Sequence, residues 1–208
     1  MKKIIFLILM ASVMACNSSN TFTETELNLI GNSADAGKMT VLQTTAKADS
    51  LLLRQVSADF TPEDLRSAPY AILQSRLLAT VNDPDHPGVG IAAPQVGILR
   101  NLIAVQRFDK EGEPFEFYAN PVIEVYGEQT AIGMEGCLSV PDRSEAVNRS
   151  QSIVLSYLHE ATGERIRETV EGFTAVIFQH EVDHLNGILY IDRMVELPSD
   201  AAGDTMEE

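Results

Sequence analysis

The segment that most restricts the possible folds is His180-Glu181-Val182-Asp183-His184, near the end of the chain. In a helix, residues four apart lie on one face, one turn above the other, so the two imidazoles can share one metal ion. Glu181 lies beside them and can accept a proton from water at that metal, and the spacing is typical of zinc hydrolases. A third ligand must come from elsewhere. Cys137 is the best candidate, so the fold has to bring it to this helix.

Two further segments accompany this one in a characteristic order. They are residues 88–95 (Gly-Val-Gly-Ile-Ala-Ala-Pro-Gln) and 135–139 (Glu-Gly-Cys-Leu-Ser), and Gln179 precedes the histidine segment. All three resemble the signature motifs of the peptide deformylase family, and the resemblance extends over residues 50–197. It implies an α+β fold in which antiparallel β-sheets surround a central C-terminal helix that carries the metal motif.

The proposed ligands, Cys137, His180 and His184, leave one tetrahedral position open for water, as a catalytic metal requires. A thiolate suits Fe(II), Zn, Co or Ni better than Mg or Ca. The resemblance implies Fe(II) as the native cofactor, with Zn or Ni as alternatives. In the alternative interpretation, both histidines are core residues that only form hydrogen bonds.

The positions of these residues and the resemblance predict catalytic roles. Glu181 lies beside two proposed ligands and is expected to be the general base, although a solvated helix carboxylate is the simpler alternative. The resemblance implies the roles of the next two groups. Gln95 and the backbone N–H of Leu138 are the two donors that stabilise the oxyanion of the tetrahedral intermediate. Asp183 is expected to have a structural role, with orientation of a ligand as the alternative.

Substrate contacts are expected from several short segments. Gly88 and Gly90 suit a tight backbone beside which a peptide can lie. Many family members carry an arginine that contacts the peptide about seven residues after the ligand cysteine. Ser144 occupies that position here, so either Arg143 replaces it or the preference for peptide length has changed. The resemblance places four more residues where a pocket for an unbranched apolar side chain is built, although they could be plain core: Val89, Phe173, Val176 and Ile177.

The N-terminus predicts export. Lys2 and Lys3 precede an apolar run that is too short to span a bilayer, which is typical of a signal peptide. Residues 13–16 (Val-Met-Ala-Cys) resemble a lipobox, so residues 1–16 are expected to direct lipidation of Cys16; a plain secretory signal cut near Ala15 is the alternative. Residues 17–49 are predicted to be a flexible tether, residues 50–197 the catalytic domain and residues 198–208 a disordered acidic tail.

The composition limits the partners of the chain. With 208 residues and 45% hydrophobic content, it can form one well-packed domain. A formal net charge of −15 argues against nucleic acid and anionic membrane surfaces, although an acidic surface could simply maintain solubility. We expect a monomer whose only membrane attachment is the lipid.

Local patterns predict the secondary structure. A helix is expected from Thr61 to about residue 81, and a second from Thr174, as its cap, to Asn186, with Phe173 and Phe178 packed at its start. Buried or alternating apolar residues predict strands at 102–105 and 115–118, and a hairpin that joins residues 153–157 to 166–170.

Together these observations predict an exported, lipid-anchored hydrolase that removes the formyl group from the N-terminal formylmethionine of peptides and releases formate. One alternative is an exported metal-dependent amidase that acts on another N-acyl peptide. The other is a catalytically silent lipoprotein that binds metal or peptide, against which the presence of both Glu181 and Gln95 argues.

Overall fold

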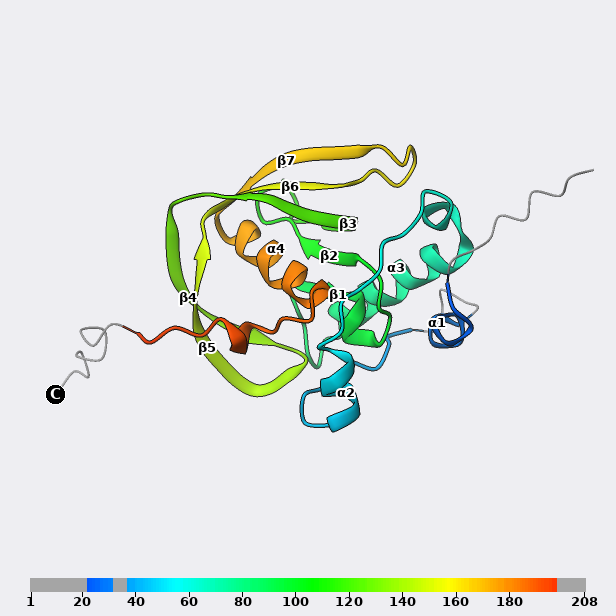
Figure 1. The fold of residues 1–208 in the computed structure, drawn as a ribbon, viewed down its shortest axis with the longest axis horizontal. Coiled ribbons are helices and arrows are strands. Elements are labelled where there is room, and N and C mark those ends of the chain that lie inside the picture. Colours follow the sequence, from blue (N-terminus) through cyan, green and yellow to red (C-terminus); the bar gives the residue numbers. More distant parts are fainter. Residues whose placement is uncertain (1–21, 32–36, 198–208) are drawn as a thin grey trace, which may run out of the picture.

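In the computed structural model, which describes residues 22–31 and 37–197, antiparallel strands surround one helix, α4 (Gly172–Leu185) (Figure 1). This arrangement confirms the predicted α+β fold with a central C-terminal helix. A five-stranded sheet has the order β1-β2-β3-β6-β7, and β4 and β5 form a separate pair. The strands are β1 (Gly90–Ala92), β2 (Leu102–Gln106), β3 (Phe115–Tyr126), β4 (Thr130–Cys137), β5 (Val140–Ser150), β6 (Ser152–Leu158) and β7 (Arg165–Glu171).

The predicted strands are present, and one is longer than expected. β3 continues past Asn120, where the register with β6 shifts and the backbone adopts a φ of 49°. The Asn120 side chain secures this irregularity, since it accepts a hydrogen bond from Phe60 N at 2.8 Å and donates one to Phe60 O at 2.9 Å. Beyond it, β3 leads into β4. β3 stays paired with β6 as far as Tyr126, so the chain leaves the large sheet only at residues 127–129, just before the strand that holds Cys137.

Helix α4 begins earlier than the sequence predicted. Its N-cap is Glu171, and Gly172, with a φ of 62°, makes the corner directly after β7. Thr174 is therefore buried in the first turn and is not the cap. Phe178 lies in the core, whereas Phe173 is 56% exposed and packs on Phe108, with ring centroids 5.3 Å apart.

The predicted helix at residues 61–81 is divided into two elements. The short 3-10 helix Asp64–Arg66 has Glu63 as its N-cap, and Thr61 Oγ1 only accepts a hydrogen bond from Asp64 N at 3.2 Å. α3 (Ala68–Val81) starts after its own cap, Ser67, whose hydroxyl accepts a hydrogen bond from Tyr70 N. The Ser67 hydroxyl forms a hydrogen bond with the backbone in place of the regular helical bond. This local competition explains why one continuous helix does not form.

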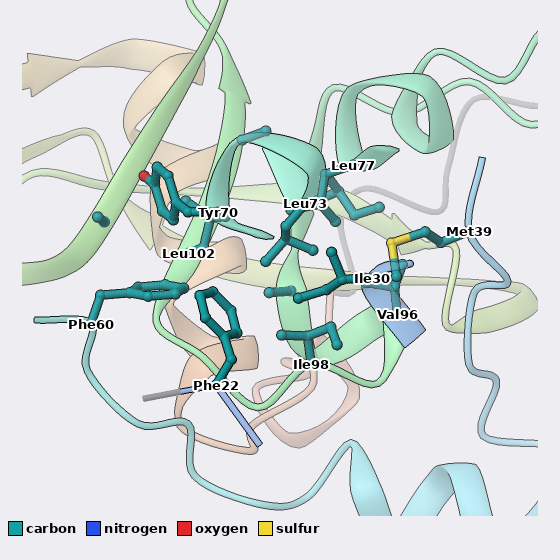
Figure 2. Close-up of a cluster of buried hydrophobic side chains, with 14 of the residues drawn as sticks. Phe22, Ile30, Met39, Phe60, Tyr70, Leu73, Leu77, Val96, Ile98 and Leu102 are labelled. Atoms are coloured by element: carbon teal, nitrogen blue, oxygen red, sulfur yellow. The ribbon is translucent and has the colours of Figure 1, made fainter. Parts of the chain in front are cut away.

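The expected flexible tether is wrong for its described part. Residues 24–30 form α1 (Glu24–Ile30), which starts with a capping box between Thr23 and Glu26. Phe22 and Ile30 are buried and pack with α3 in one hydrophobic cluster (Figure 2). α2 (Lys47–Leu52) follows. A seven-residue helix shows no sustained period, so α1 could not be predicted from the sequence pattern.

Predictions for the signal peptide, for Cys16 and for the acidic tail concern residues outside the described ranges. Within the described ranges, no helix is both long and apolar enough to cross a membrane.

Candidate active site

Helix α4 and strand β4 bring three potential metal ligands together. His180 and His184 are one turn apart on α4, and their ring centroids are 5.1 Å apart. Cys137, the last residue of β4, places its Sγ 3.3 Å from His184 Nε2. One donor atom from each of the three residues lies within 4.8 Å of the others. The structure therefore brings the predicted ligands to one point.

The position of Cys137 follows from a break in the β4–β5 pairing. Gly136 pairs with Ser144, whereas Cys137 pairs with Val140, so the register shifts between these neighbours. The pairing then closes in a tight turn at Leu138 and Ser139. The turn holds the thiol at the end of the two-stranded sheet, beside α4.

Glu135 holds one of the proposed ligands in place, a role that was not predicted from the sequence. Its Oε2 lies 2.8 Å from His180 Nδ1, so it fixes the orientation of that ring and leaves Nε2 for a metal. Burial would raise the pKa of Glu135, but hydrogen bonds from His180 and Arg149 lower it to about 2. Residues two apart on a strand share a face, so the spacing of Glu135 and Cys137 was the available signal.

Asp183 supports this arrangement indirectly. Arg149 donates to Glu135 Oε1 at 2.7 Å and to Asp183 Oδ2 at 2.6 Å, and Arg193 also donates to Asp183. Arg149 and both carboxylates are buried. Asp183 therefore has the predicted structural role: it fixes the arginine that holds the partner of His180.

Glu181 is buried beside the ligands, with 4% of its surface exposed. Burial raises its pKa to about 7. Its Oε2 has no hydrogen-bond partner among the described residues. An ionisable group left unpaired in such a place points to a reacting partner, because an unpaired buried polar atom is costly.

Gln95 is oriented with its amide toward the ligand cluster. Its Oε1 accepts a hydrogen bond from Ala92 N at 2.8 Å, so Nε2 points to Cys137 Sγ at 3.4 Å and to Ser139 Oγ at 3.3 Å. Gln95 is 2% exposed and belongs to a short 3-10 helix, Ala93–Val96. The predicted donor pair, Gln95 and Leu138, thus flanks Cys137.

A cavity of about 900 Å³ opens over this cluster. His180, Glu181 and Cys137 line it, whereas His184 is buried behind them with 1% of its surface exposed. Every residue predicted to contact substrate also lines the cavity: Gly88, Val89, Gly90, Phe173, Val176, Ile177 and Arg143.

The pocket residues and the arginine differ in exposure. Val89 and Phe173 are 38% and 56% exposed, so they are not plain core, while Ile177 is 4% exposed and also packs in the second core cluster. Arg143 is exposed, and its Nε donates to Glu145 at 2.6 Å. A guanidinium carries five N–H donors, so Arg143 can contact a peptide through its Nη atoms while Nε stays on Glu145.

A methyl group at position 90 should disturb the proposed base. A Cβ added there would lie 2.5 Å from Glu181 Oε1 and 2.9 Å from Ile177 Cγ2, so Glu181 would have to move. We expect Gly90→Ala to lower kcat/KM by roughly 10²-fold, the cost of misplacing a group by about 1 Å, with metal content unchanged. Gly133→Ala is the matched control, because a Cβ there meets no atom within 4 Å. Equal activity of both variants would contradict this placement of Glu181.

Comparisons with known proteins give one consistent result. Residues 42–199 match the family model described as polypeptide deformylase. A peptide deformylase from Caulobacter sp. (strain K31) is 39% identical over 165 residues, which cover 78% of this chain and 91% of that protein. One from Rhizobium meliloti (strain 1021) is 37% identical over 151 residues, or 72% of this chain and 83% of that protein.

Solved structures agree with these relatives. A Met-Ala-Ser-bound class I type b peptide deformylase from Acinetobacter baumannii has a TM-score of 0.66 and 34% identity, and the match covers 76% of this chain and 98% of that chain. A peptide deformylase from Thermotoga maritima also has a TM-score of 0.66, with 31% identity and coverage of 76% and 99%.

Proposed function

Because the chain belongs to the peptide deformylase family, we propose that it hydrolyses the formamide bond at the N-terminal formylmethionine of peptides and releases formate. The observation that carries the proposal is the buried, unpaired Glu181 next to the Cys137, His180 and His184 cluster, under a cavity large enough for a peptide end. The proposal includes one divalent metal, the roles of individual residues, and attachment to a membrane through Cys16.

The three ligand residues fit a divalent metal ion. His180 Nδ1 is engaged by Glu135, so its Nε2 would bind the ion together with His184 Nε2 and Cys137 Sγ. Two imidazoles and a thiolate favour Fe(II), Zn(II) or Ni(II) over Mg and Ca. A bound ion supplies Lewis acidity, which lowers the pKa of water and polarises a carbonyl group.

Glu181 handles the proton in the proposed reaction. Its carboxylate takes a proton from the attacking water as the new C–O bond forms at the formyl carbon. It then passes this proton to the methionine nitrogen as the C–N bond breaks, so formate and a free amine leave. A cation nearby would lower the pKa of about 7 that burial produces, which favours the proton-accepting form.

Gln95 and Leu138 stabilise the charge that develops on the formyl oxygen. The Gln95 side chain is held by Ala92 N, and its amide nitrogen points toward Cys137. The second donor is the backbone N–H of Leu138, the residue after Cys137 in the chain. Donors that are oriented before the reaction need no rearrangement as the charge forms. The methionine side chain would enter the apolar part of the cavity that Val89, Phe173 and Ile177 line.

One experiment separates this function from its alternatives. Purified chain with Fe(II) is assayed with formyl-Met-Ala-Ser and with acetyl-Met-Ala-Ser. The proposed deformylase cleaves the formyl peptide and releases stoichiometric formate. Preference for the acetyl peptide would indicate another amidase, and binding of Met-Ala-Ser without turnover of either peptide would indicate a binding protein.

We also propose that the exported protein carries mostly Zn. An Fe(II) centre outside the cytoplasm meets oxygen, and the Cys137 thiolate is open to oxidation when metal is lost, whereas Zn has no redox chemistry. Protein from its own membrane should contain predominantly Zn, and anaerobic exchange to Fe(II) or Ni(II) should raise its turnover. Metal analysis before and after exchange is the measurement. Air-stable protein loaded with iron would contradict this proposal.

Attachment through Cys16 is the last part of the proposal. The support is the sequence Val13-Met14-Ala15-Cys16 after a charged and apolar N-terminus. In cells given a fatty-acid probe, the native chain should be labelled and sediment with membranes, and Cys16→Ser should lose the label. Cys137→Ser is the control, because its thiol lies in the folded domain. An unlabelled native chain in the soluble fraction would contradict lipidation.

A further inference from the structure

Helix α1 lies outside the residues that match the family, yet it is built into the core. Ile30 is fully buried, and Phe22 packs on Phe60 with ring centroids 5.6 Å apart (Figure 2). Glu26 and Arg100 form a buried ion pair, with Nε–Oε1 and Nη2–Oε2 distances of 2.7 and 2.9 Å. Burying two charges costs free energy unless they are closely paired, as they are here. The pair therefore fixes the position of α1 on the core.

One arginine joins α1 to the described segment that comes next in the chain, which starts at Gly37. Arg76 on α3 donates through Nη1 to the carbonyl oxygens of Leu29 and Ile30, both at 2.8 Å. Its Nε donates to Gly37 O at 3.1 Å, and Nη2 lies 3.5 Å from Lys38 O. The C-terminal end of α1 and the start of the next segment are therefore held by the same guanidinium.

This next segment forms part of the wall of the active-site cavity. Met39 N donates to Thr80 Oγ1 at 2.8 Å, and the Lys38 side chain pairs with Asp83. The segment then contacts the catalytic region, where Leu42 N donates to Gln95 O at 2.7 Å. The cavity-lining residues of the segment are Lys38, Met39, Thr40, Val41 and Gln43.

We propose that α1 is a clamp that holds residues 38–41 as a substrate-binding wall, and that this wall contacts the peptide beyond its formylmethionine. The inference rests on the proposed function, which places the formyl group and the methionine at the metal cluster and the apolar pocket. A cavity of about 900 Å³ has room for further peptide residues. Lys38 and Thr40 are exposed on this wall, so it offers polar groups to a peptide backbone.

A matched pair of variants separates the effect of undocking α1 from the effect of adding a negative charge to it. Ile30→Asp places a charge at a fully buried position and should release α1, whereas Leu29→Asp changes the neighbouring side chain, which is 44% exposed. Arg76→Gln is a milder second variant that removes the link to residues 37–38, with the exposed Arg66→Gln as its control. All four changes are made in the full chain.

The readouts are kcat and KM for formyl-Met-Ala-Ser and for the shorter formyl-Met-Ala, and the Kd of the metal-loaded protein for Met-Ala-Ser. We expect Ile30→Asp and Arg76→Gln to raise KM for the longer peptide about five-fold over their controls, with kcat within about two-fold and a smaller change for the shorter peptide. A purely structural role would lower the melting temperature and the active fraction, and would leave KM unchanged.

Each outcome distinguishes the inference from the function on which it rests. If KM and Kd in both variants equal those of their controls while the native chain deformylates peptides, the inference is overturned and the function stands. If the native chain binds Met-Ala-Ser without turnover and both variants weaken that binding, the wall is supported and the deformylase function fails. A native chain that neither binds nor cleaves these peptides would overturn both.

Discussion

Replacing Glu181 with glutamine is expected to reduce kcat by at least about 10²-fold, the low end for a positioned acid–base group, while the metal stays bound. Glutamine keeps the shape of the side chain but cannot accept the proton of water. The metal should stay because the proposed ligands, Cys137, His180 and His184, are unchanged. Parallel turnover assays and metal analysis of native and variant protein are the measurement.

Stability can be separated from catalysis in this variant. Glu181 is buried and has an unpaired oxygen, so a neutral side chain there avoids the cost of burying a charge, and we expect no loss of melting temperature in the metal-free protein. Glu171→Gln, at the exposed N-cap of the same helix, is the matched control and should keep native turnover. A near-native rate of Glu181→Gln would show that another group is the general base.

Cys137→Ala is expected to lose both metal and activity, with turnover more than about 10²-fold below the native value at stoichiometric metal. The thiolate is one of the three proposed ligands, and its removal would leave two imidazoles to hold the ion. Metal content per chain after gel filtration, measured beside turnover, gives the result.

The two variants together test the division of roles in the site. Glu181→Gln should be inactive with metal, and Cys137→Ala should be inactive without it. If Cys137→Ala retains one metal per chain and native turnover, the third ligand has been assigned to the wrong residue.

The motif residues could be found from the sequence because their spacing has a local meaning. The separation of His180 and His184 is one helical turn, so a helix alone places them on one face. Strands β2, β6 and β7 were predicted for a similar reason, since apolar residues alternate or run together along them. Such patterns depend on neighbours in the chain and need no knowledge of the tertiary structure.

Other features depend on contacts between distant segments. α1 was predicted as flexible, because its few apolar residues do not reveal that Ile30 and Phe22 fill a space beside α3. The early start of α4 follows from Gly172 and the corner after β7, and Thr174 gave a misleading local signal. The orientation of His180 by Glu135 joins residues 45 apart in the sequence.

The sequence by itself determined the kinds of groups in the active site: two imidazoles, one thiolate, one carboxylate and an amide donor, in three segments of recognisable order. Only the tertiary structure decided how they are held. The register shift before Cys137 delivers the thiol to α4, and Arg149 secures Glu135 behind His180. Residue types and local spacing can be read directly from the sequence. Burial, strand register and the packing of α1 depend on contacts between distant segments, which exclude water from one another.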